Sequence, residues 1–138
     1  MATPVITTPR PPLNVFDAKR INVTENWQTI FHTPIYRIPA VGPNPERDVE
    51  IVALLTSLII TNPMPQTIGV SLRIDDGVNP PWLVLNDLLV PRNDFALIEL
   101  SKQNLPSGEA LQVRVNAGQS AVAHLSFVSN QREEFRVL

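Results

Sequence analysis

The sequence contains no cysteine, and only two histidines and five glycines occur among its 138 residues. The absence of cysteine excludes disulfide frameworks, thiolate zinc sites and cysteine nucleophiles. Two histidines without cysteine make a transition-metal site improbable. Charged residues make up 17% of the chain, against a typical share of about 25%, and a net charge of -2 offers no basic surface to a nucleic-acid backbone. We therefore expect no metal, no cofactor and no direct nucleic-acid partner.

The motifs of common enzymes are also absent. The chain has no glycine-rich phosphate loop, no paired-histidine metal pattern and no Gly-x-Ser-x-Gly turn. His32 and His124 fall on polar positions of expected strands, which is typical of exposed or cross-strand histidines. Asp75, Asp76 and Asn79 could offer oxygens to calcium, but the following glycine favours a simple turn. We predict that the protein is not an enzyme.

Long apolar runs are missing as well. The N-terminal residues do not contain the apolar core of a secretory signal, and the longest apolar stretch, Ile51 to Ile60, is too short to span a bilayer. These features favour a soluble protein that is not exported by the standard route and has no membrane partner.

Proline, in contrast, is abundant: the chain has 14, about twice the average usage of ~5%. Proline at this frequency disfavours long helices and favours extended segments, edge strands and turns. A hydrophobic content of 43% predicts a folded core, and the length fits one domain of roughly 100–200 residues. The composition therefore indicates an all-β domain.

Residues 1–18 hold four prolines and show neither a helical nor a strand period. The pair Pro11-Pro12 favours polyproline II, in which backbone groups have no internal partners. We expect an extended proline-rich N-terminal arm that lies on a partner, although packing against its own domain would explain the segment equally. The expected anchors to the partner are Val5, Ile6, Pro9, Pro11, Pro12, Leu13, Val15 and Phe16.

Residues 19–138 show about eight short apolar runs divided by turn signals. Residues 48–61 are apolar at both alternating positions, but their β-branched content and the Asn-Pro that follows favour a strand over a buried helix. This spacing predicts a single antiparallel β-sandwich, jelly-roll-like, behind the arm. The expected core residues are Ile68, Val70, Leu72, Ile74, Leu111, Val113, Val115, Leu125 and Phe127, with their alternates exposed or at subunit contacts.

The order of features in the C-terminal half is specific. An apolar strand ends in Leu88-Leu89-Val90-Pro91, followed by Arg92-Asn93-Asp94-Phe95, then residues 105–113 (LPSGEALQV), then the strand from Ala121 to Phe127. This order resembles the small β-sandwich virion proteins of tailed bacteriophages, and the segments 27–31, 36–39 and 59–62 look like that family's first strands. The likeness covers residues 20–137. Glu109 stands where that family usually has aspartate, and the long arm is a second departure.

The resemblance implies a non-enzymatic structural protein of a phage particle, located in the virion and assembled in the host cytoplasm. Within that class it favours a capsid decoration or cement protein that bridges neighbouring capsid subunits. A neck, tail or baseplate component is the alternative. A carbohydrate-binding host-attachment module is a minority alternative, since Trp27, Tyr36 and Trp82 could line a sugar-binding face. The implied partners are copies of the chain itself, as a homo-oligomer such as a trimer, and the major capsid protein or another virion protein.

Overall fold

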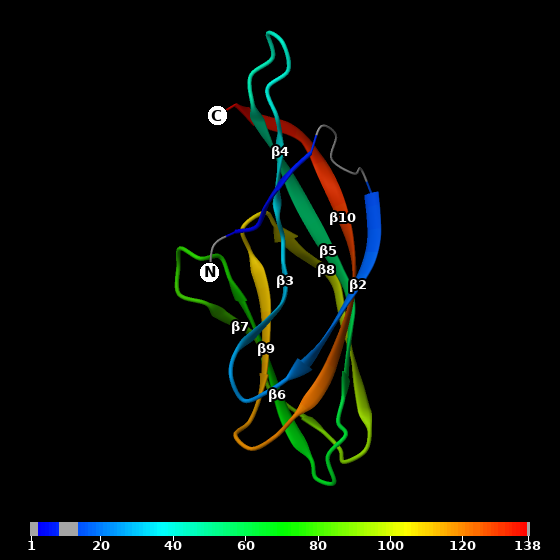
Figure 1. The fold of residues 1–138 in the computed structure, drawn as a ribbon. Coiled ribbons are helices and arrows are strands. Elements are labelled where there is room, and N and C mark those ends of the chain that lie inside the picture. The colour runs from blue at the N-terminus through cyan, green and yellow to red at the C-terminus, as the bar shows by residue number, and fades with distance from the viewer. Residues whose placement is uncertain (1–2, 9–13, 138) are drawn as a thin grey trace.

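The computed structural model describes residues 3–8 and 14–137, and the described residues form ten strands and no helix (Figure 1). The strands are β1 (Val5–Thr7), β2 (Asn14–Val23), β3 (Gln28–His32), β4 (Ile35–Ile38), β5 (Arg47–Thr61), β6 (Ile68–Asp75), β7 (Trp82–Val90), β8 (Phe95–Pro106), β9 (Ala110–Val115) and β10 (Ala121–Val137). The prediction of an all-β chain is confirmed. In the described part of the chain, no helix has the length and apolar character needed to cross a membrane.

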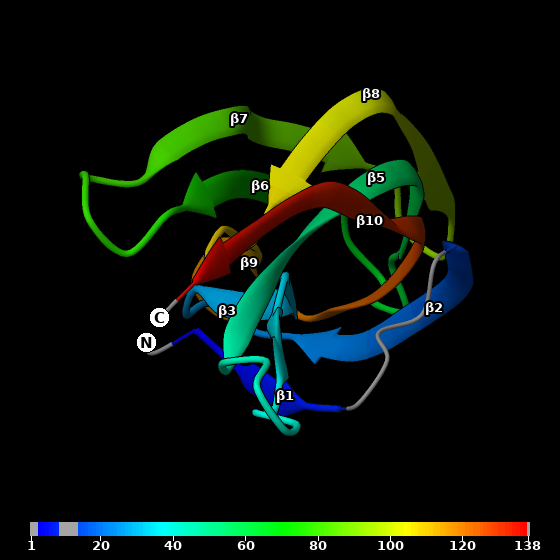
Figure 2. The ribbon, with the colours of Figure 1, turned by 90° about the horizontal axis from the view of Figure 1, so that it is seen from above.

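The strands divide into two sheets that pack face to face (Figure 2). The larger sheet, here sheet A, has the order β1-β4-β5-β10-β2, and β8 pairs with β5 on the edge that β4 leaves free. The smaller one, sheet B, has the order β3-β9-β6-β7. Pairing is antiparallel except between β1 and β4, which run parallel. The arrangement confirms the predicted sandwich, with this one parallel pair as an exception.

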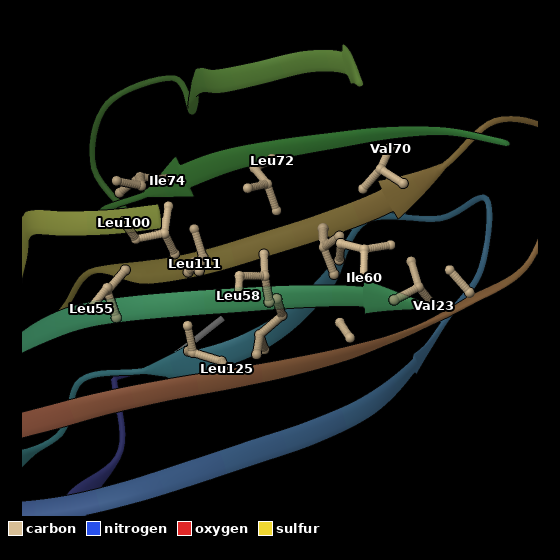
Figure 3. Close-up of a cluster of buried hydrophobic side chains, with 14 of the residues drawn as sticks. Val23, Leu55, Leu58, Ile60, Val70, Leu72, Ile74, Leu100, Leu111 and Leu125 are labelled. Carbon is tan, nitrogen blue, oxygen red and sulfur yellow. The ribbon is translucent and has the colours of Figure 1, made fainter. Parts of the chain in front are cut away.

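The core lies between the two sheets and is built by alternating residues of both (Figure 3). All nine residues expected in the core are buried, each with 3% or less of its surface exposed. Their alternates are not uniformly exposed, however: Gly69, Ser71 and Gln112 are buried too. Gln112 accepts a hydrogen bond from Nε of Arg73 (2.7 Å) and donates one to the hydroxyl of Thr29 (3.2 Å). Polar side chains therefore cover part of the outer face of sheet B.

The long strands β5 and β10 continue beyond sheet B, where β4 and β1 extend the larger sheet (Figure 1). A second, smaller core forms there from Ile38, Val49 and Ile51, with Tyr36 packed against it. This extension explains why residues 48–61 are apolar at both positions. The prediction of a strand is confirmed, but burial on both faces holds only in its first half, and exposed positions alternate with buried ones after Leu55.

The chain changes sheets twice at one corner, between β3 and β4 and between β8 and β9. The hydroxyl of Thr33 donates to the carbonyl of Leu105 (2.8 Å). The hydroxyl of Ser107 donates to the carbonyl of Pro34 (2.8 Å) and accepts from the amide of Ile51 (2.9 Å). These bonds satisfy backbone groups that lie outside the strand pairing, because β8 ends and β4 begins next to each other on the same edge of β5.

Two strands are short and flanked by proline: β1 was not expected from the sequence, whereas β4 overlaps segment 36–39, which resembles a first strand of the phage virion proteins. Pro34 and Pro39 bracket β4, and Pro4 and Pro9 bracket β1. The expectation that residues 1–18 lack pairing partners is wrong for β1 and for the start of β2, because β1 pairs with β4 and β2 pairs with β10 from Asn14 onward. The boundary expected at residue 18 falls inside β2.

Candidate functional site

The residues predicted to anchor the arm are divided between two strands. Val5 and Ile6 lie on β1 and are 47% and 41% exposed, and Phe16 on β2 is 82% exposed. Val15 belongs to β2 as well. Four of the predicted anchors lie outside the described residues, namely Pro9, Pro11, Pro12 and Leu13.

The strand β1 is held by backbone hydrogen bonds to β4. The amide of Ile35 donates to the carbonyl of Pro4 (3.0 Å), and the amide of Thr8 donates to the carbonyl of Arg37 (2.9 Å). Arg37 in turn donates from Nε to a carboxylate oxygen of Asp48 (2.9 Å). The segment is thus attached to its own domain, while the side chains of its apolar residues remain accessible.

A larger apolar surface, which the sequence analysis did not single out, lies on β7. This strand ends sheet B, so one of its edges has no partner within the described residues. Its exposed apolar residues, together with one in the preceding loop, form what we call the β7 edge: Val78 (88% exposed), Trp82 (43%), Leu83 (55%), Val84 (38%) and Leu89 (64%).

Edge strands of soluble proteins are usually protected by charge, proline or distortion. Between Trp82 and Val90 the only charged residue is Asp87, and no proline occurs. A signal was present in the sequence, because residues 82–85 and 88–90 are apolar at both alternating positions. That pattern is also typical of a central strand, so the sequence alone did not indicate an edge.

Asp87 bends the strand. It occupies a left-handed conformation (φ 55°) at a register shift opposite Ser71, which is the geometry of a β-bulge. Its carboxylate accepts a hydrogen bond from the side-chain amide of Asn116 (2.9 Å). Both side chains lie against Gly69, where a Cβ atom would overlap them.

The outer face of sheet A carries a second group of exposed residues. At the end of β5 and the start of β8 there is an open hollow of about 550 Å³. Its lining includes the apolar side chains of Ile59, Pro63 and Phe95, and polar groups of Asn93 and Asp94. Ile59 and Phe95 are 37% and 61% exposed.

The acidic turn after β6 is stabilised by its own backbone. Oδ1 of Asp76 accepts hydrogen bonds from the amides of Val78 and Asn79, both at 2.8 Å, and these bonds hold the pKa of Asp76 below its usual value. Asp75 accepts from the amide of Gly77 (2.9 Å). These local bonds confirm the turn, and the described residues contain no group of three or more acidic, histidine or cysteine side chains placed to hold a metal ion.

The two histidines lie in different surroundings. His124 is exposed on β10, as predicted. His32 is half-buried at the corner, where Nε2 lies 3.2 Å from the carbonyl oxygen of Gly108 and Nδ1 is buried without a hydrogen-bond partner. Nearby, burial raises the pKa of Glu109, and the charge of Asp76 adds to the effect. The hydroxyl of Ser107 is engaged by backbone groups, so this corner holds strands together.

The three aromatic residues considered for sugar binding do not gather on one face. Tyr36 packs against the small second core in sheet A. Trp27 precedes β3, and the guanidinium groups of Arg73 and Arg114 lie 4.4 Å and 4.6 Å from the centre of its ring. Trp82 lies on the β7 edge.

Comparisons with known proteins give distant structural likenesses only. No protein-family model and no curated protein matches the chain. The chain is similar to a pentameric capsid protein isolated from metagenomic phage sequences, known from two crystal structures, at 14% identity and a TM-score of 0.33, covering 83% of this chain. It spans about 60% of the length of that protein.

A further likeness is to the extra small virus of the giant freshwater prawn Macrobrachium rosenbergii, seen as a virus-like particle. The identity is 10% and the TM-score 0.28, covering 91% of this chain and 86% of that one. TM-scores of this size do not indicate the function of this chain.

Proposed function

We propose that this protein is a non-enzymatic structural component of a virus particle, and that it acts by adhesion between subunits. The observation that carries the proposal is the β7 edge, where four exposed apolar side chains of β7 and one of the preceding loop lie along a strand edge that has no partner within the described residues. Apolar patches of this kind mark interaction surfaces, and an unpaired strand edge offers backbone donors and acceptors to a neighbour. The resemblance of the C-terminal half to phage virion proteins supports the same role.

Within this class we propose a capsid decoration or cement protein that bridges neighbouring shell subunits. A two-layer sandwich with an apolar edge on β7 and accessible apolar residues on β1 offers two separate contact regions, which a bridging protein needs. A neck, tail or baseplate component would use the same surfaces and is the second candidate. The partners are copies of this chain in a closed symmetric oligomer, such as a trimer, and a larger shell protein of a phage.

The test is the mass of the purified chain before and after the β7 edge is made polar. We expect the full chain to sediment as an oligomer, and Leu83→Asp with Leu89→Asp to dissociate that contact while circular dichroism stays unchanged. Val41→Asp is the matched control, since Val41 is 62% exposed in the β4–β5 loop, away from this edge. Wild-type assembly by the double variant would refute the role of the β7 edge.

A further inference from the structure

Two arginine side chains gather on one tryptophan at the outer face of sheet B. The guanidinium carbon of Arg73 lies 4.4 Å from the centre of the Trp27 ring, and that of Arg114 lies 4.6 Å from it. Strand pairing brings the arginines together, because Arg73 of β6 is paired with Gln112 of β9. Arg114 follows two residues later on the same face of β9, and Trp27 directly precedes β3, the neighbour of β9. Two positive charges are thus held on one ring.

Neither arginine has an anionic partner within the described residues. Nε of Arg73 donates to the neutral side-chain oxygen of Gln112 (2.7 Å), and no ion pair joins Arg73 or Arg114 to an acidic residue. Asp75, two residues after Arg73 on β6, accepts a hydrogen bond from a backbone amide, and Asp87 on β7 accepts one from a side-chain amide. The charges of the two arginines are therefore not compensated by the residues around them.

These uncompensated charges have the chemistry of an oxyanion receptor. Like charges that lie close together repel each other, and a bound anion relieves the repulsion. Each guanidinium group presents N–H donors in a planar fork that fits the two oxygens of a carboxylate or phosphate. Arg114 is exposed, and its side chain makes no hydrogen bond within the described residues, so its donors are available.

An apolar surface borders the two arginines. Leu83 of β7 is paired with Arg73, and Leu89 is paired with Gly69, so both leucines lie on the same face of sheet B as the arginines. They are 55% and 64% exposed. A nucleic-acid backbone fits this surface poorly, because the chain has a net charge of -2 and the border is apolar. A protein segment with a carboxylate beside apolar side chains matches both features.

We propose that Trp27, Arg73 and Arg114 form a receptor for an aspartate or glutamate side chain of a partner protein, whose apolar neighbours pack against Leu83 and Leu89. The inference rests on the proposed function for the existence of a neighbouring subunit, and it adds the chemistry that this subunit presents. Charged groups at an interface fix the register of the partners and exclude wrong ones. The carboxylate therefore sets how the partner lies on the β7 edge.

Trp27 itself reports whether the receptor is occupied. The chain has two tryptophans, so Trp82→Phe leaves Trp27 as the one indole. The probes are the capped peptides acetyl-Leu-Glu-Leu-amide and acetyl-Leu-Gln-Leu-amide, titrated into the full chain while fluorescence is recorded. We expect the acidic peptide to bind about tenfold more tightly or better, because hydrogen bonds between ionised groups are about twice as strong as neutral ones. Added salt should reduce this difference.

Substitutions in the Trp82→Phe background separate a receptor from a stack that only stabilises the fold. Arg114→Gln should remove the preference for the acidic peptide and leave circular dichroism unchanged, because the side chain is exposed. Arg114→Lys should keep part of the preference, since an ammonium group retains the charge but not the planar fork. The matched control is Arg20→Gln, which removes an exposed arginine of sheet A and should bind the acidic peptide as the parent chain does.

Three results would overturn the proposal. The first is no difference between the two peptides, including binding of neither, and the second is an acidic preference that survives Arg114→Gln. The third is tighter binding of inorganic phosphate or a thymidine oligonucleotide than of the acidic peptide, which would identify a phosphate site. Each is a peptide-binding result, so it can occur whether or not Leu83→Asp with Leu89→Asp dissociates the oligomer, and failure here is distinguishable from failure of the proposed function.

Discussion

At the scale of single residues, the best-determined positions are those of the core. Val113 and Phe127 come from different sheets and are 0% and 3% exposed. The ring centre of Phe127 lies 4.2 Å from the ring centre of Phe31. Truncating either to alanine removes packed apolar atoms and leaves a cavity, so we expect each variant to lose about 1–5 kcal/mol of unfolding free energy. Urea titration of both, beside the exposed control Val41→Ala, measures this. Losses below ~0.5 kcal/mol for both would refute the placement of the core.

Two carboxyl groups should act on stability in opposite directions as pH changes. The pKa of Asp76 is lowered by hydrogen bonds from backbone amides, so its contribution is present above the ordinary aspartate pKa and is lost as pH falls through the lowered value. The pKa of Glu109 is raised, first by burial and then by the charge of Asp76. Its contribution is therefore fully present below the ordinary glutamate pKa and is lost as pH rises through the raised value.

We accordingly predict that Glu109→Gln melts at a higher temperature than the wild type at neutral pH, and that the difference disappears in acid. Asp76→Asn should show the reverse, with a loss at neutral pH that shrinks on acidification. Thermal melts over a pH series test both variants. A lower melting temperature of Glu109→Gln at neutral pH would contradict the assigned cause.

At the scale of elements, the bulge in β7 depends on a single glycine in β6. The side chains of Asp87 and Asn116 lie over Gly69, and their hydrogen bond would be displaced by any Cβ atom there. We expect Gly69→Ala to cost about 1–3 kcal/mol, as other overpacking substitutions do. Because the overlap is with these side chains, adding Asp87→Ala should recover part of the loss. If the double variant is no more stable than Gly69→Ala, measured by urea titration, the contact is not the cause.

The alternation of apolar residues was sufficient to predict the central strands and the core. It is a local signal, and in β6, β9 and the first part of β10 apolar residues recur at every second position along the strand. The strand β4 could not be predicted in this way, because it has four residues and a proline on each side. Its pairing with β1 joins segments about 30 residues apart, and no local pattern specifies such a contact.

The candidate interaction surfaces were predicted less well than the core. The sequence pointed to apolar anchors in residues 1–18, of which Phe16 is prominently exposed. The apolar residues of β7 gave the same pattern that a central strand gives, since alternation shows which residues are apolar but not whether a neighbouring strand exists. The position of β7 at the end of sheet B is a property of the topology.

The strand β1 provides a test of what the N-terminal segment does. Its three residues pair only with β4 and their side chains are exposed, so we expect deletion of residues 1–8 to leave the sandwich folded. If the deletion lowers the free energy of unfolding by ~1 kcal/mol, the melting temperature should fall by about 2–8 °C. If the segment also anchors a partner, the truncated chain should assemble less tightly, as measured by sedimentation. A truncated chain that fails to fold would show that β1 is required by its own domain.

At the scale of the whole molecule, the described residues combine a buried apolar core with two groups of exposed apolar side chains. The core extends through both sheets, whereas the β7 edge and the face of sheet A expose apolar side chains that a monomer in solution would not need. The two surfaces lie on different sheets, so a single copy can contact more than one neighbour. This arrangement is what a particle protein that acts by adhesion requires.

The most direct test of this role is a cryo-EM reconstruction of a particle that carries the protein. The proposed function predicts density for a two-sheet sandwich at repeated positions on the particle, with the β7 edge buried against a neighbouring subunit in each copy. Density on the outside of the shell would support the cement role, and density at the neck, tail or baseplate the second candidate. Absence of the protein from particles, or a β7 edge facing solvent in every copy, would contradict the account.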